Sequence, residues 1–68
     1  MIFRIEVEQE EDGRWIAEVL ELAGAMTYGT TRDEAIGRAK ALALRAMAER
    51  LEHGEARPDL ADIAFRAA

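Results

Sequence analysis

The junction at residues 29–36 constrains the fold of this chain more than any other stretch. Thr31 is followed three residues later by Glu34, and a long run rich in alanine and leucine comes next. This spacing is that of a capping box. In it, the threonine side chain accepts the backbone N–H of the glutamate, and the glutamate carboxylate accepts the backbone N–H of the threonine. The junction therefore predicts that a helix begins near Arg32 and that the chain before Gly29 is built differently.

Two stretches before the junction alternate apolar and polar residues with the period of a half-buried strand. The apolar positions are Phe3, Ile5 and Val7 in the first stretch and Trp15, Ala17 and Val19 in the second. A two-residue Asp12-Gly13 turn would put these two sets on opposite faces, because a slip of one residue turns a whole face over. A three-residue loop over 11–13, ending in a left-handed Gly13, instead pairs Ile5 with Val19 and Val7 with Ala17 on one face.

A third strand and one long helix follow the hairpin. Gly24 and Gly29 bracket a short strand over 25–28, and the helix is predicted from about Arg32 to His53, with Gly54 as its C-terminal stop. Its apolar residues are a central stripe of Ile36, Ala39, Ala43 and Met47, with Leu44 and Leu51 on one side and Ala35, Leu42 and Ala46 on the other. This arc is wider than a surface helix needs. We therefore expect a homo-oligomer, most simply a dimer, with the interface at Leu42, Leu44 and Ala46.

The tail after the helix allows two interpretations. Residues 55–59 form a connector, in which Pro58 biases the preceding residue to an extended conformation. Beyond it, Ile63 and Phe65 alternate as in a strand, whereas Leu60, Ile63, Ala64 and Ala67 also fit a helical face capped by Asp59. We favour an edge strand, because a meander followed by a long helix leaves a sheet edge to cover. The chain is then one domain over residues 1–68, with the meander and helix over 1–54 and the connector and edge strand over 55–68.

Composition excludes several classes of function. A chain of 68 residues with no cysteine and one histidine has neither a disulfide framework nor the ligands of an ordinary zinc site. A net charge of -5 argues against a duplex-binding surface, which needs clustered lysine and arginine. No stretch approaches the roughly 20 apolar residues of a membrane span, and the chain begins directly with a strand-like run. The expectation is a cytoplasmic protein with no membrane segment.

Acidic residues gather on the strand face opposite the apolar set. They are Glu6, Glu8, Glu10 and Glu18, interrupted by Ile2, Ile16 and Leu20. An ordinary interpretation is a solvated acidic surface. The functional interpretation is a docking surface for a basic partner, with Glu6 and Glu8 supplying charge and Ile16 and Leu20 acting as apolar anchors. We expect Glu6 and Glu18 to face each other across the strands, where like charges cost stability that a cationic partner would restore.

Three segments also carry a family resemblance. They are DGRWIAEV at 12–19, ELAGA at 21–25 and GTTRDEA at 29–35. From about residue 2 to Gly54 the chain resembles the HicB-like antitoxin domain, although it has Leu20 and Ala23 where family members often have proline. The resemblance implies a partial ribonuclease H-like fold of the α+β class. The element order would be strand-strand-strand-helix-strand, with a mainly antiparallel four-stranded sheet of order 3-2-1-4 and the long helix packed on one face.

The same resemblance implies a non-catalytic antitoxin that masks a small basic HicA-type mRNA-cleaving toxin. Longer family members add a C-terminal DNA-binding module, for which residues 55–68 are too few, so direct binding to nucleic acid is not expected. The alternative is an orphan homo-oligomeric scaffold or regulatory protein with no toxin partner.

Catalytic interpretations are weaker. A metal-dependent nuclease would need Glu6 or Glu8 to converge with Glu34 and Asp62 on ions about 4 Å apart, yet the first two belong to the face away from the helix. His53 in the last helical turn suits the helix dipole better than catalysis, and Trp15 suits a core or an oligomer interface. The glycines at 13, 24 and 29 are too widely spaced for a phosphate loop. We expect no catalytic residue, metal or cofactor.

Overall fold

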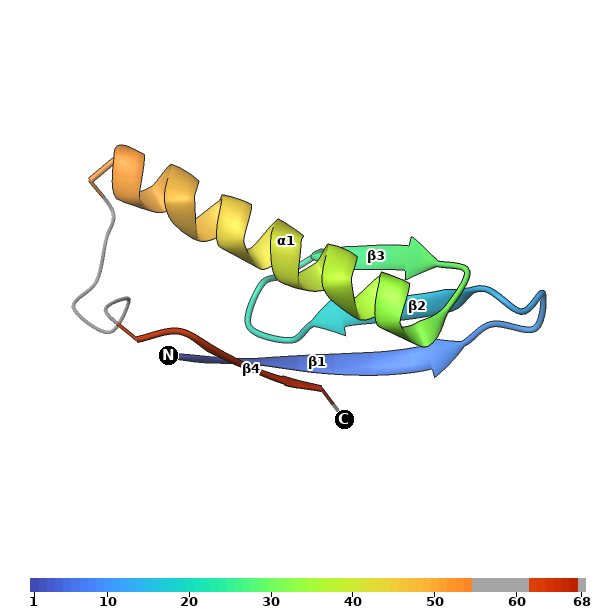
Figure 1. Cartoon of the computed structure of the whole chain (residues 1–68). Helices are drawn as coiled ribbons and strands as arrows, with labels where there is room; N and C mark the ends of the chain where they lie inside the picture. Colours follow the sequence, from blue (N-terminus) through green and yellow to red (C-terminus); the bar gives the residue numbers. More distant parts are fainter. Residues whose placement is uncertain (55–61, 68) are drawn as a thin grey trace.

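The fold is one sheet covered on one face by one helix. In a computed structural model that describes residues 1–54 and 62–67, three strands precede the helix and one follows it (Figure 1). The elements are β1 (Ile2–Gln9), β2 (Trp15–Val19), β3 (Met26–Gly29), α1 (Arg32–Glu52) and β4 (Ala64–Ala67). The strand order is β3-β2-β1-β4, with β1 antiparallel to β2 and parallel to β4. This confirms the predicted α+β architecture and strand order.

The tail forms the predicted edge strand rather than the alternative helix. β4 pairs with β1 in a register that places Phe65 opposite Phe3, and the two rings stack with centroids 5.7 Å apart. The Asp59 cap and Leu60 of the helical alternative lie outside the described residues. The strand covers the β1 edge because its alternation turns Phe65 toward the helix side, where the ring packs against the core.

The β1–β2 hairpin has the register that the apolar pattern predicts. Ile5 lies opposite Val19 and Val7 opposite Ala17. The Glu10 N–H donates to the Arg14 carbonyl at 2.7 Å, which closes a three-residue loop over 11–13. Gly13 ends this loop with a φ of 92°, a conformation that side chains disfavour. The two-residue Asp12-Gly13 turn is thereby excluded.

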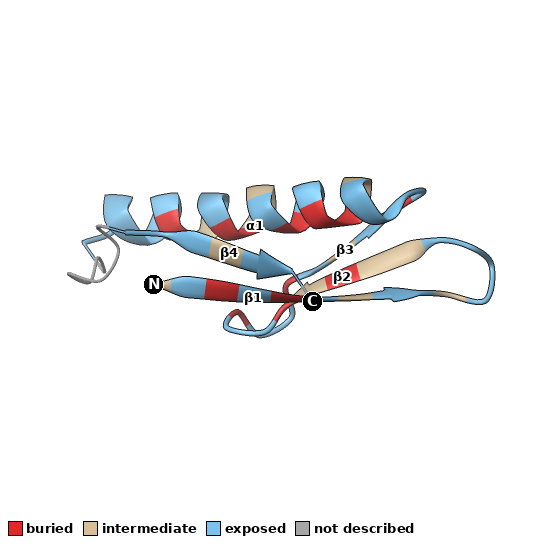
Figure 2. Ribbon diagram, turned by 60° about the horizontal axis from the view of Figure 1, so that its bottom comes forward, coloured by how far each residue is buried: buried red, intermediate tan, exposed pale blue. Residues whose placement is uncertain are grey.

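The core lies between the sheet and the helix (Figure 2). The buried residues are Phe3, Ile5, Ala17, Val19, Leu22 and Ala25 from the sheet side and Ala35, Ile36, Ala39, Ala43 and Met47 from the helix. The predicted helix stripe is therefore the buried one. Its fully buried alanines, Ala39 and Ala43, let the helix backbone approach the sheet closely. No polar or charged side chain is buried within the described part of the chain.

The helix begins at the predicted cap. Thr31 accepts the Glu34 N–H at 3.1 Å, and the Glu34 carboxylate accepts the Thr30 N–H at 3.3 Å and the Thr30 hydroxyl at 3.2 Å. The Glu34 carboxylate therefore bonds to Thr30, the residue before the N-cap, rather than to the N-cap residue Thr31 itself. Gly29 makes this turn possible, because a Cβ there would lie 2.6 Å from the Ala35 nitrogen. Gly29 is also the last residue of β3, which begins at Met26, one residue later than predicted.

The helix ends where its glycine stop predicts. Glu52 is its last residue, His53 is the C-cap, and Gly54 follows with a φ of 72°. No helix in residues 1–54 or 62–67 combines the length and the apolar character that crossing a membrane requires.

Candidate binding surface on the open face of the sheet

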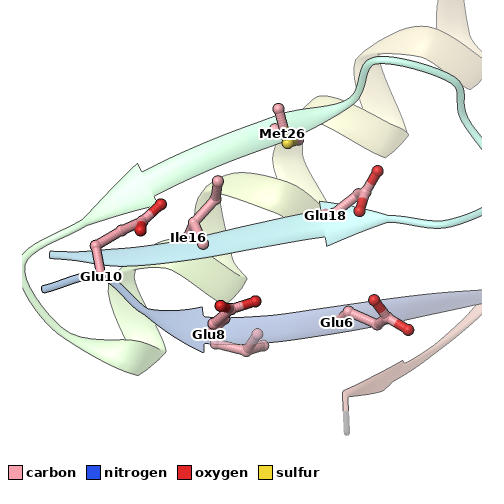
Figure 3. A pocket seen from close by; sticks show the side chains of 7 residues that line it. Glu6, Glu8, Glu10, Ile16, Glu18 and Met26 are labelled. Carbon is pink, nitrogen blue, oxygen red and sulfur yellow. The ribbon is translucent and has the colours of Figure 1, made fainter.

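The side of the sheet opposite α1 is uncovered in the described structure. Side chains alternate along a strand, so the register sorts the residues of this side into rows that cross the sheet. The rows are Ala64 and Ile2; Arg66, Arg4 and Leu20; Glu6, Glu18 and Met26; Glu8, Ile16 and Tyr28; and Glu10 with Arg14. We call this surface the open face. Figure 3 shows its central part, where six labelled side chains project away from the helix over a shallow depression of about 430 Å³.

The carboxylates of the open face repel one another. Glu6 lies directly opposite Glu18, as predicted, and Glu8 follows on β1. The ion pairs among the described residues join Arg4 to Glu21, Arg14 to Asp12 and Arg38 to Glu34, and none of them reaches the glutamates of the open face. Like charges directly opposite across two strands destabilise a sheet. The glutamates of the face therefore form no ion pair among the described residues, although Arg4 interacts electrostatically with Glu6.

The arginine nearest the glutamates is held by another carboxylate. The Arg4 backbone N–H donates to Glu21 at 2.7 Å and its Nε–H donates to the other oxygen at 2.6 Å. The pKa of Glu21 is lowered, chiefly by the side-chain hydrogen bond from Arg4, and the pKa of Arg4 is raised by the same bond. β2 ends at Val19, so the Arg4 backbone N–H has no further strand residue to bond to. The Glu21 carboxylate accepts this N–H instead.

Sequence reasoning did not find this role of Glu21. Its position in the loop after β2 offers no periodic signal, and the hydrogen bond to Arg4 spans 17 residues.

A similar pair of hydrogen bonds holds Arg14 at the other end of the open face. The Arg14 backbone N–H and Nε–H both donate to Asp12, at 3.1 and 2.7 Å. The backbone hydrogen bond is the main reason that the pKa of Asp12 is lowered. The Arg14 guanidinium also lies 4.9 Å from the centre of the Tyr28 ring. Arg4 and Arg14 are thus engaged by other carboxylates, whereas Arg66 lies in the same row as Arg4 and lines a hollow with Glu6.

Apolar side chains accompany the charges. Leu20 is 38%, Tyr28 41% and Met26 49% exposed, and Ile16 is half-buried between its neighbours. The structure therefore brings together the four residues predicted as partner-binding, Glu6, Glu8, Ile16 and Leu20, on one surface. It adds Met26 and Tyr28, which sequence reasoning missed. Their signal was present, because they alternate within the short third strand.

The residues considered for a nuclease do not converge. Glu6 and Glu8 belong to the open face, whereas Glu34 is bound up in the helix cap on the other side. The Asp62 carbonyl accepts the N-terminal ammonium at 2.7 Å. In the described part of the chain, no three His, Asp or Glu side chains are grouped to hold a metal ion. His53 is exposed at the helix end, and Trp15 is half-buried against the core.

The three residues predicted at an oligomer interface are placed on two sides of the helix. Leu42 and Ala46 pack partly against the core and line a shallow hollow with Leu22 and Ala25 of the β2–β3 connection. Leu44 instead is 47% exposed on the other flank of α1. Of the three, only Leu44 is exposed, whereas Leu42 and Ala46 are half-buried.

No protein-family model matches the chain, and no curated protein or solved structure is detectably similar to it.

Proposed function

We propose that this chain is a non-catalytic protein-binding module that docks a basic protein on its open face. One observation carries the proposal: Glu6 and Glu18 face each other, with Glu8 beside them, and no described cation pairs with any of the three. A positively charged side chain placed over this cluster would relieve the repulsion between the carboxylates. The stability lost in the free module would be regained on binding.

The apolar residues of the face supply the second half of an interface. Protein interfaces combine a desolvated apolar centre with a polar rim, and a few large side chains contribute most of the affinity. Ile16, Leu20 and Met26 lie among the glutamates and are large enough for that role. The glutamates would steer encounter with the basic partner, while the apolar contacts would govern how slowly the complex dissociates.

The family resemblance suggests which partner this is. The chain would be a HicB-like antitoxin, and the partner a small basic HicA-type toxin whose mRNA-cleaving surface the open face covers. The agreement between the observed strand order and the order that the resemblance implies supports this identification. A cytoplasmic location and the absence of any catalytic residue, metal, cofactor or direct nucleic-acid contact belong to the same proposal.

The alternative, a homo-oligomeric scaffold or regulatory protein without a toxin, is favoured by one observation. Two leucines on the outward flank of α1, Leu44 and Leu51, are 47% and 54% exposed. Self-association through them would leave the open face free, so this observation does not exclude a basic partner.

Surface plasmon resonance tests the proposal with any small basic protein that a neighbouring reading frame encodes. We expect Glu6→Lys/Glu8→Lys to slow association by tenfold or more at low salt, since electrostatic steering changes on-rates by about 10- to 1,000-fold. Salt should reduce the wild-type rate in the same way, because exposed charges are screened over about 8 Å at physiological ionic strength. Leu20→Asp should mainly speed dissociation.

The matched control is Glu11→Lys/Glu49→Lys, which changes net charge equally but lies off the open face. It should retain most of the association rate. Equal losses for both double variants would contradict docking on the open face. No binding of the neighbouring-frame protein at all would overturn the antitoxin assignment and favour the scaffold.

A further inference from the structure

β1 continues past the end of β4, so part of one of its edges has no strand beside it (Figure 1). β4 pairs with residues 2–5 of β1, whereas β2 pairs with residues 5–9 on the other side. Within residues 1–54 and 62–67, no strand lies against the β4 side of β1 beyond Ile5. We call the main chain of residues 7–9 on this side the free edge.

The hydrogen bonds of the hairpin show which main-chain groups point to the free edge. The Leu20 N–H donates to the Arg4 carbonyl, and the Glu10 N–H donates to the Arg14 carbonyl. The even-numbered residues of β1 therefore bond toward β2. Because successive residues of a strand direct their N–H and C=O groups to opposite edges, those of Val7 and Gln9 point to the free edge. Such groups are a template for a further strand.

The two outer edges of the sheet are less suited to a basic partner than the free edge. At the β3 edge, the Arg38 side chain already donates to the Tyr28 carbonyl at 2.7 Å. At the β4 edge, the charged residue on the open face is a cation, Arg66. Beside the free edge, Glu8 lies between Glu6 and Glu10 along β1 (Figure 3) and forms no ion pair among the described residues.

We propose that an extended basic segment of the partner adds to the sheet as a strand along the free edge. The inference rests on the proposed function, since it states how a basic partner engages the open face. An added strand keeps the alternation of the sheet, so one set of its side chains lies beside Glu8 and the other beside the half-buried Val7. Opposite charges and apolar pairs both stabilise neighbouring strands. The segment would therefore alternate lysine or arginine with valine or isoleucine.

This mode of binding divides affinity from specificity. In strand addition, main-chain hydrogen bonds supply affinity and alternate side chains supply specificity. Here the main chain of Val7 and Gln9 would supply the first, and the carboxylate of Glu8 and the side chain of Val7 the second. An acidic or uncharged segment would find the same main-chain groups without the charge contact.

The same alternation disfavours pairing between the free edges of two copies of this chain. To keep Val7 on the helix side, even-numbered residues of one β1 must lie opposite even-numbered residues of the other. Where the two free edges overlap, glutamates then lie opposite glutamates, because positions 6, 8 and 10 are all glutamate. Like charges directly opposite destabilise a sheet. Charge therefore selects a basic segment over a second free edge.

Fluorescence anisotropy with a labelled peptide tests strand addition without the natural partner. The probe is an acetylated heptapeptide in which lysine and valine alternate, and a scrambled peptide of the same composition, which should bind more weakly, is its control. N-methylation of alternate residues blocks the N–H groups along one edge of the peptide only. We expect one of the two methylated peptides to bind about tenfold more weakly than the parent, and the other to bind like it. Equal affinities for all three would overturn the proposal.

Proline at position 7 tests the same hydrogen bond from the protein side. Val7→Pro removes an N–H that points to the free edge, a position at which strands tolerate proline. It should weaken peptide binding by about tenfold, whereas Val7→Ala, which keeps the N–H, should weaken it by no more than about threefold. Ala67→Pro is the matched control at the outer edge of β4, since the Ala64 N–H donates to the Met1 carbonyl and the Ala67 N–H therefore points away from β1. Circular dichroism checks that each variant is folded.

Glu8→Lys separates strand addition from docking on the face alone, because it should weaken binding in both cases. Binding that Glu8→Lys removes, and that Val7→Pro and both methylated peptides retain, would overturn strand addition while docking on the open face stands. No binding of the parent peptide, with a basic protein still bound at the open face, would have the same meaning. Loss with Val7→Pro but not with Ala67→Pro would support the added strand.

Discussion

The two faces of the sheet are built from the same strands and differ in almost every physical respect. On the helix side, Phe3 and Ile5 are buried in a core that contains no polar side chain of the described residues. On the open face, Arg4 and Glu6 alternate with them along β1, and Glu6 faces a second carboxylate, that of Glu18. Packing accounts for the buried residues of the first face. It does not account for the second, and this is why we look for function there.

The largest effect expected from this contrast comes from truncating one side chain on each face. Phe3→Ala should lower the free energy of unfolding by about 3–5 kcal/mol, because it empties a fully buried site and removes a ring stacked on Phe65. Met26→Ala on the open face should change it by no more than about 0.5 kcal/mol. Urea titrations followed by circular dichroism measure both. Comparable losses would mean that the open face is also part of the core.

A smaller loss is expected at the junction between β3 and the start of α1. Gly29→Ala places a Cβ 2.6 Å from the Ala35 backbone nitrogen, so the helix start must shift. Overpacking of this kind typically costs about 1–3 kcal/mol. Gly37→Ala is the control, since its Cβ meets nothing in the described structure, and it should stabilise the monomer. An unchanged unfolding midpoint for Gly29→Ala would show that the junction is looser than the structure indicates.

In the β1–β2 loop, a substitution at Gly13 should be opposed by backbone strain alone. At Gly13 there is open space around the added Cβ but φ is 92°, so Gly13→Ala should cost about 1 kcal/mol through backbone conformation. Chemical denaturation gives the difference, and Glu11→Ala in the same loop serves as the control. A neutral Gly13→Ala would argue against the three-residue loop and its register.

The smallest effect has the opposite sign and tests the open face directly. Glu18→Gln removes the repulsion with Glu6, so it should stabilise the protein by about 0.2–1 kcal/mol. Glu49→Gln, an exposed helical position, should change stability little. Denaturation at low salt measures the difference, which should shrink as salt is added. Destabilisation by Glu18→Gln would mean that the described fold already makes use of this carboxylate.

The dependence of stability on pH distinguishes the carboxylates that accept hydrogen bonds from arginine, such as Glu21, from the glutamates of the open face. The pKa of Glu21 is lowered from its ordinary value of 4.5 by Arg4, so its contribution to stability is present above about pH 4.5. That contribution is lost as pH falls through the lowered folded-state pKa. Glu21→Gln should therefore flatten the acid limb of the curve of stability against pH, whereas Glu11→Gln should not. A superimposable acid limb in Glu21→Gln would contradict the role given to the Arg4 contact.

Most of the fold could be predicted from the sequence because local rules agreed with one another. The apolar residues around Val7 and Ala17 had to lie on the same face of the sheet. Of the two loops considered, only the three-residue loop ending at Gly13 gives that register. Thr31 and Glu34 marked the helix start, although the carboxylate bonds to the residue before the cap. The tail strand followed from an uncovered sheet edge together with the alternation around Phe65.

The rest depended on contacts that no local pattern records. The apolar arc of the helix is wide, but its width alone could not show that the β2–β3 connection covers Leu42 while Leu44 stays exposed. Glu21 was missed because it serves a backbone group 17 residues away. The acidic face itself was predicted from alternation, whereas the engagement of Arg4 and Arg14 elsewhere, which leaves the glutamates unpaired, required the structure.

The central claim is that the open face, rather than the helix, receives a basic protein. Methyl-resolved NMR of the chain, titrated with a small basic protein that a neighbouring reading frame encodes, tests it most directly, because each face has its own methyl groups. We predict that the methyl signals of Ile16, Leu20 and Met26 shift or broaden on binding. Those of Leu44 and Leu51 should stay unchanged at a fixed chain concentration. Perturbation confined to the two helix leucines, with the open-face methyls unmoved, would contradict the account.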